Sequence, residues 1–200
     1  MTILNIAQNV CLTLGMAVPD EVTGSTLREM NELQQFITET CSEIARRVQW
    51  GDLTKEQTLT GDGTAKKHDL AADFDRLTGG VCVVGSGGVV RPLTQSEWPS
   101  ITSIAGVPRY FLLQDDTIKF HPFLPIGATV QVSYQSANFV DGTARTFTND
   151  AQSPIFDQRL VEAGTVARWR RQKGMPYQDF EAEYEALIAQ QAQYDDRGRF

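Results

Sequence analysis

The hydrophobic periodicity of this chain changes twice, and each change separates helical sequence from β-rich sequence. Residues 1–50 carry two apolar stripes in which residues recur every three or four positions, as they do on one face of an α-helix. The stripes consist of Ile3, Ile6, Ala7, Val10, Cys11 and Leu14, then Leu27, Met30, Leu33, Ile37, Cys41, Ile44 and Val48. They predict two antiparallel helices. The first should end at Gly15, and Thr26 with Glu29 should cap the second.

Residues 51–135 have a different texture. Short runs of β-branched and aromatic residues alternate there with Gly, Pro and Asp, which is typical of strands and turns. The turns are expected at Gly61-Asp62-Gly63, at Gly85–Gly88 and at Asp115-Asp116. The first of these turns should join strands at Lys55–Thr60 and Thr64–Leu70. Val130, Val132 and Tyr134 alternate with polar residues, as in a strand with one face in solvent. We expect a small antiparallel sheet or an open barrel.

Residues 136–152 form a long polar stretch without periodicity. Loops longer than about 12–15 residues usually have a function or are disordered. Two interpretations therefore remain open: the segment reaches a neighbouring subunit, or it is a mobile connector.

Residues 153–200 return to a helical pattern. Ser153 is a favourable N-cap and Pro154 suits the first helical position. Apolar stripes over Phe156–Ala167 and Phe180–Tyr194 predict two helices and a short tail. The whole order predicts an α+β fold, namely a four-helix bundle of two N-terminal and two C-terminal helices with an inserted small antiparallel β domain. Its parts are residues 1–50, 51–135, 136–152 and 153–200.

Charge and composition limit the classes of partner. The formal net charge is −7, which argues against a protein that grips phosphates, because nucleic-acid affinity comes largely from Lys and Arg. No signal peptide is evident, and no apolar run reaches the roughly 18 residues of a membrane span. We therefore expect a soluble protein made in a reducing cytoplasm.

Cys11 and Cys41 lie on apolar helical stripes and are expected to be buried thiols.

Residues with catalytic potential are few. His68 and His121 have no Cys or His partner at metal-ligand spacing, and Ser86 lacks the G-x-S-x-G pattern of a hydrolase nucleophile. The pairs Asp73/Asp75 and Asp115/Asp116 could in principle run glycoside hydrolysis, but both also fit turn chemistry. We therefore predict no enzymatic activity, no metal and no cofactor.

The most basic stretch contains Arg168, Trp169, Arg170 and Arg171. Helical spacing spreads these charges around the cylinder, so they form no single groove-reading face. One interpretation is a solvated face that pairs with acidic neighbours. The other is a subunit interface in which Trp169 is an anchor, since Trp and Arg dominate interface hot spots. Trp169 could equally belong to the core.

A resemblance rests on the order of motifs in the β-rich part. These are Ala72-Asp73-Phe74-Asp75-Arg76-Leu77, Arg91-Pro92-Leu93 with Glu97-Trp98, Gly106-Val107-Pro108-Arg109-Tyr110, the turn at Asp115-Asp116 and the strand Thr129–Tyr134. With the flanking helix pairs, this order resembles the head-to-tail adaptor (connector) proteins of tailed bacteriophages and gene transfer agents. The resemblance covers nearly the whole chain.

The resemblance implies a structural subunit at the neck of the virion. Such adaptors form a ring, commonly of twelve copies, that joins the portal protein to tail or stopper proteins. The ring lines the channel through which double-stranded DNA passes without sequence-specific binding, including during genome ejection. The C-terminal end of the chain docks into the portal. The portal-docking candidates here are Tyr184, Gln191, Tyr194, Arg197, Arg199 and Phe200.

Two alternatives remain. One is a tail-associated peptidoglycan hydrolase that uses Asp73 and Asp75. The other is a structural protein at another junction of the particle, such as a stopper or a tail completion ring.

Overall fold

The computed structural model describes residues 1–101 and 106–197, with side chains described as far as Gln193. The chain folds into two compact units. The helical unit comprises Met1–Leu53 and Ala137–Phe200, and the β unit comprises Thr54–Ser136. Among the described residues, none of the helices combines the length and apolar character needed to cross a membrane.

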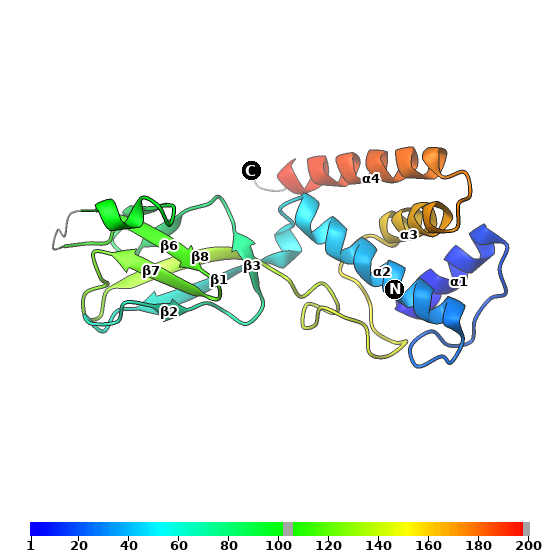
Figure 1. Ribbon diagram of the computed structural model, residues 1–200, viewed down its shortest axis with the longest axis horizontal. Coiled ribbons are helices and arrows are strands. Elements are labelled where there is room, and N and C mark those ends of the chain that lie inside the picture. Colours follow the sequence, from blue (N-terminus) through cyan, green and yellow to red (C-terminus); the bar gives the residue numbers. More distant parts are fainter. Residues whose placement is uncertain (102–105, 198–200) are drawn as a thin grey trace. The chain divides into compact units, whose positions relative to one another are not determined.

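The helical unit contains the four predicted helices, which Figure 1 shows: α1 (Ile3–Leu14), α2 (Arg28–Arg47), α3 (Gln158–Gln172) and α4 (Gln178–Arg197). The stop at Gly15 is confirmed, because this residue has φ 68° and its N–H bonds to carbonyls of the last turn of α1. The predicted capping box of α2 is wrong. Its N-cap is Leu27, which makes no side-chain capping bond. Helix α3 begins later than expected, because Asp157 rather than Ser153 caps it.

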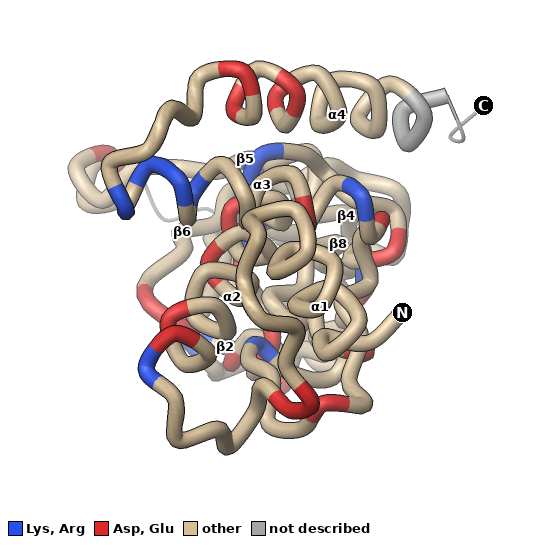
Figure 2. Tube along the Cα trace, turned by 90° about the vertical axis from the view of Figure 1, so that its right-hand side faces the viewer, with Lys and Arg blue, Asp and Glu red and all other residues tan. Residues whose placement is uncertain are grey.

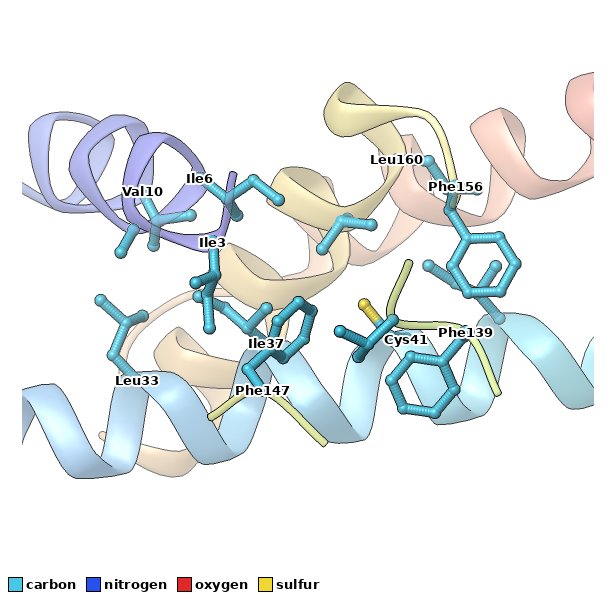
Figure 3. Close-up of a cluster of buried hydrophobic side chains, with 14 of the residues drawn as sticks. Ile3, Ile6, Val10, Leu33, Ile37, Cys41, Phe139, Phe147, Phe156 and Leu160 are labelled. Atoms are coloured by element: carbon cyan, nitrogen blue, oxygen red, sulfur yellow. The ribbon is translucent and has the colours of Figure 1, made fainter. Parts of the chain in front are cut away.

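Helix α3 packs against α1, α2 and α4, so the helices share one hydrophobic core. Figure 3 shows how this core is built from α1, α2, the start of α3 and the segment before it. The labelled residues are Ile3, Ile6, Val10, Leu33, Ile37, Cys41, Phe139, Phe147, Phe156 and Leu160. Cys11 and Cys41 are confirmed as buried thiols.

The irregular segment before α3 is part of this core. Phe139, Val140 and Phe147 are at most 4% exposed and pack among the helices. The N–H of Ile3 donates to the carbonyl of Gln152 at 2.8 Å. The segment is therefore packed against its own unit and is not a free connector, whereas its reaching a neighbouring subunit stays a prediction.

The β unit is an eight-stranded, nearly closed, barrel-like sheet. Its strands are β1 (Thr54–Thr60), β2 (His68–Asp69), β3 (Phe74–Leu77), β4 (Cys82–Val84), β5 (Val89–Pro92), β6 (Tyr110–Gln114), β7 (Thr117–His121) and β8 (Thr129–Ser136). The strand order is β1-β8-β4-β5-β6-β7-β2, and β3 pairs with β8. The sheet has its own hydrophobic core.

The predicted fold class is therefore wrong. The β part is not a small antiparallel insert in a helical bundle but a large sheet that follows the N-terminal helices. The sheet is also mixed, because β5 and β6 pair in parallel through Arg91↔Tyr110 and Pro92↔Phe111. Alternation of apolar residues locates strands but does not say which strands pair, so the sequence pattern could not reveal this arrangement.

The turn predictions had a mixed outcome. The turns at Gly85–Gly88 and Asp115-Asp116 are confirmed, since they join β4 to β5 and β6 to β7. The hairpin expected around Asp62 is wrong, because β1 pairs with β8 and the short β2 pairs with β7.

The two ends of the strand order, β1 and β2, are bridged by the side chain of Gln57. Its side-chain Nε2 donates to the carbonyl of Asp69 at 3.1 Å, and its Oε1 accepts from the N–H of Ala71 at 2.9 Å.

Candidate functional site

The most concentrated polar chemistry of the β unit surrounds Asp73, just before β3. Its carboxylate accepts hydrogen bonds from Lys55 Nζ at 2.7 Å, Tyr134 Oη at 2.8 Å and Ser136 Oγ at 2.8 Å. These donors come from the first and last strands of the unit, β1 and β8. The Asp73 side chain is 17% exposed. The arrangement joins β3 to both strands through one carboxylate.

The electrostatics of this cluster do not suit acid catalysis. Burial acts to raise the pKa of the Asp73 carboxyl, but the hydrogen bonds from Lys55, Ser136 and Tyr134 outweigh this effect and lower the pKa to about 2. Glycoside hydrolysis needs one protonated carboxylic acid beside a second carboxylate. Asp73 is instead an anion at neutral pH. The neighbouring Asp75 carboxylate pairs with Arg76 at 2.8 Å. The geometry therefore favours a structural ion-pair cluster.

The other sequence-predicted candidates are dispersed. The ring of His68 lies 5.7 Å from that of Phe120, and the ring of His121 lies 6.0 Å from that of Trp98. Within the described part of the chain, no group of three or more His, Cys, Asp or Glu side chains could hold a metal ion. Burial raises the pKa of the Cys82 thiol to about 12, which keeps it protonated.

The basic stretch of α3 is engaged inside the helical unit. Trp169 is 4% exposed, and its ring meets that of Phe36 edge-on at 5.8 Å, so it belongs to the core. Arg170 donates to the carbonyl of Pro176 at 2.6 Å, and its guanidinium lies 4.4 Å from the centre of the Phe180 ring. These contacts agree with the interpretation in which the stretch pairs with its own neighbours.

Ion pairs extend this pattern across three helices. Arg168 on α3 pairs with Glu39 at 3.1 Å and also with Glu43, both on α2. Arg171 pairs with Glu181 of α4 at 3.4 Å. Figure 2 shows the acidic residues in the first half of α4. Exposed ion pairs contribute little stability individually, so the buried contacts of Tyr184 and Ile188 dominate the position of α4.

Tyr184 packs α4 against the rest of the helical unit. It is 5% exposed, and it lies so close to Gly164 that a Cβ there would sit 2.6 Å from its ring. Arg47 lies over the same ring, 5.6 Å from its centre. Burial raises the pKa of the Tyr184 hydroxyl. Tyr184 thus packs α4 on α3, and its part in portal docking stays a prediction.

Of the remaining docking candidates, Gln191, Tyr194 and Arg197 lie in α4, and Arg199 and Phe200 follow it in the sequence. Gln191 is half-buried. The side chains of Tyr194, Arg197, Arg199 and Phe200 lie outside those that the structure describes.

Sequence reasoning missed two surface features. One is Ile126, which at 83% is the most exposed large hydrophobic residue among those that the structure describes. The other is a pocket of about 470 Å³ along Pro19–Met30. The local signals were the apolar run Phe123-Leu124-Pro125-Ile126 between two strands and the acidic pair Asp20-Glu21 between two helices.

Comparison with known proteins identifies one family. The family model described as SU10 adaptor protein matches residues 1–199. A search of curated proteins finds no match to the chain.

Proposed function

Because the chain belongs to the SU10 adaptor protein family, a family of phage head-to-tail adaptors, we propose that its copies form a ring that joins the portal to the tail. The family is structural, and its role implies a location at the neck of the virion. The match across residues 1–199 is the observation that carries the proposal.

The end of α4 is the proposed portal-docking element. Along this helix the buried side chains are Tyr184 and Ile188, whereas Ala189, Gln190 and Gln193 are exposed. A helix that packs through one set of side chains and leaves another set open to solvent suits capture by a partner groove. Gln191, Tyr194, Arg197, Arg199 and Phe200 are the proposed contacts, and Tyr184 holds the helix in place.

The proposed ring lines a channel for double-stranded DNA. The formal net charge of −7 supports this, because an acidic wall repels phosphates and lets the duplex pass without adhering. In the helical unit acidic residues outnumber basic ones, whereas the two are nearly balanced in the β unit. The walls of the channel are therefore expected to come mainly from the helical unit.

Mixing the purified chain with the purified portal ring tests the proposal. We expect a stable complex with several copies of the chain per portal by native mass spectrometry, and density for it between head and tail by electron microscopy of the particle. A chain truncated after Gln193 should keep its fold but lose portal binding. Density at a stopper or tail-completion position, or absence from the particle, would overturn the assignment.

A further inference from the structure

Two loops of the β unit form a rigid tip. The β1–β2 loop and the β7–β8 loop exchange backbone hydrogen bonds: Gly61 N donates to Ala128 O at 2.8 Å, Gly127 N to Gly61 O at 3.0 Å, and Gly63 N to Leu124 O at 3.2 Å. A Cβ at Gly61 would lie 2.3 Å from the carbonyl oxygen of Pro125, so the loops meet at van der Waals distance. The tip is therefore preorganised and loses little entropy when it binds.

The tip presents apolar and basic side chains together. Ile126 is 83% exposed and Phe123 is 46% exposed. Lys66 and Lys67 are exposed in the adjoining loop. The one carboxylate inside that loop, Asp62, accepts hydrogen bonds from the backbone N–H groups of Thr64 and Ala65 and shapes the turn. The surface is thus a hydrophobic knob flanked by two cations.

The helical unit carries a pocket with apolar and acidic lining residues, which complements the apolar and basic tip. The pocket lies along the connection between α1 and α2 and holds about 470 Å³. Its lining residues are Pro19, Asp20, Glu21, Ser25, Thr26, Leu27 and Met30. Leu27, which is 63% exposed, and the buried Met30 form the apolar part of this lining (the floor), and the exposed Asp20 and Glu21 form its acidic part (the rim).

The pocket is held in shape by bonds to other segments. Gln8 Nε2 donates to the carbonyl of Pro19 at 3.0 Å. The Asp150 carboxylate accepts from the N–H groups of Val22 at 3.1 Å and of Thr23 at 2.8 Å. The neighbouring cation, Arg28, is already paired with Glu32 at 2.8 Å. The acidic rim therefore faces solvent with its charge uncompensated by that arginine.

From this complementarity we infer that the tip of one copy inserts Ile126 into the Pro19–Met30 pocket of a neighbouring copy, with Lys66 and Lys67 against Asp20 and Glu21. Burial of an exposed isoleucine on an apolar floor is favourable, and the charges fix its orientation. The two patches differ, so each copy offers one of each and the contact is head-to-tail, as a closed ring requires. The inference rests on the proposed ring and names the contact that builds it.

Charge reversal with rescue tests the contact. Two double variants, Lys66→Glu with Lys67→Glu and Asp20→Lys with Glu21→Lys, are each assembled on the portal ring and measured by sedimentation velocity. We expect assembly to weaken by about tenfold or more in each variant. When the two variants are mixed, the acidic tip of one faces the basic pocket of the other, so part of the assembly should be restored. Circular dichroism and thermal unfolding identify any variant that has lost its fold. Loss without rescue, or no loss in folded variants, overturns the inference.

Cysteine cross-linking gives an independent measurement. The three native cysteines are buried, so they should not compete. Ile126→Cys with Leu27→Cys should yield disulfide-linked copies in the ring, whereas Met175→Cys with Leu27→Cys should not, although Met175 is also exposed. A ring that forms on the portal without this cross-link overturns the contact and leaves the proposed function intact. Cross-linking of Ile126→Cys to a portal or tail protein assigns the tip to that partner instead. Absence of any ring in the wild type overturns both.

Discussion

The carboxylate of Asp150 accepts a hydrogen bond from the backbone N–H of Thr23 at 2.8 Å, across 127 residues of sequence. The same carboxylate accepts from the Thr23 hydroxyl at 2.6 Å and from the N–H of Val22. Burial acts to raise the pKa of Asp150, but these hydrogen bonds outweigh it and hold the pKa below its ordinary value. One side chain thus joins the segment before α3 to the connection between α1 and α2.

Replacement of Asp150 should destabilise the helical unit. Asp150→Ala leaves the N–H groups of Val22 and Thr23 without this acceptor, and Val22 is fully buried. Loss of charge-assisted hydrogen bonds to buried donors costs about 1–3 kcal/mol. The measurement is urea unfolding followed by the fluorescence of Trp50 and Trp169. Asp150→Asn keeps one acceptor oxygen and should lose less; equal stability of all three proteins would contradict this role.

The sequence predicted the helices of this unit well because their apolar residues recur with helical spacing. It did not predict that the segment before α3 packs among them. Phe139 and Phe147 occupy core positions without any regular spacing, and such burial is fixed by tertiary contacts alone. The polar residues between them suggested a solvated loop, but Asp150 uses its polarity to bond to a neighbouring segment.

Gly164 should tolerate no side chain where α3 meets α4. A Cβ there would lie 2.6 Å from the Thr40 Cγ2 and 2.6 Å from the Tyr184 ring. Gly164→Ala is therefore expected to destabilise the protein by about 1–3 kcal/mol through overpacking, despite the better helix propensity of Ala. Faster backbone hydrogen exchange in α4 would locate the effect. Gly88→Ala is the control, because its Cβ would meet only Val84, at 3.9 Å.

The β unit shows a different limit of sequence reasoning. The turns at Gly85–Gly88 and Asp115-Asp116 were predictable because Gly and Asp favour turn conformations locally. The parallel pairing of β5 with β6 was not, because the segment that separates them carries no signal for its direction. The sequence also could not predict that Gln57 of β1 bonds to Asp69 of β2. These strands end the strand order, and they meet only because the barrel nearly closes.

Gln57 should contribute to that closure. Gln57→Ala removes both side-chain bonds, to the carbonyl of Asp69 and the N–H of Ala71. Two hydrogen bonds of this kind contribute about 1–3 kcal/mol together. Hydrogen exchange should accelerate at Ala71 and along β2 more than in β8. Gln131→Ala is a matched control, because this exposed amide makes only a long 3.4 Å bond to Glu56.

Absence of lytic activity is expected from the state of Asp73. A carboxyl with a pKa of about 2 cannot act as the general acid at neutral pH. Purified wild type and Asp73→Asn should both leave peptidoglycan intact in a turbidity assay, with lysozyme as the positive control. Lysis by the wild type that Asp73→Asn abolishes would restore the hydrolase alternative.

Asp73 should instead contribute pH-dependent stability to the β unit. Its folded-state pKa of about 2 lies below the ordinary carboxyl value, so its contribution is fully present above that ordinary value. It is lost as the pH falls toward and through about 2, when the folded state must also take up the proton. From the size of the shift, Asp73→Asn should cost on the order of 2 kcal/mol at pH 7. Urea unfolding of both proteins at pH 7, 4 and 2.5 should show this difference shrinking as the pH falls. A difference that is constant across this range would mean that Asp73 acts through its shape and not through its charge.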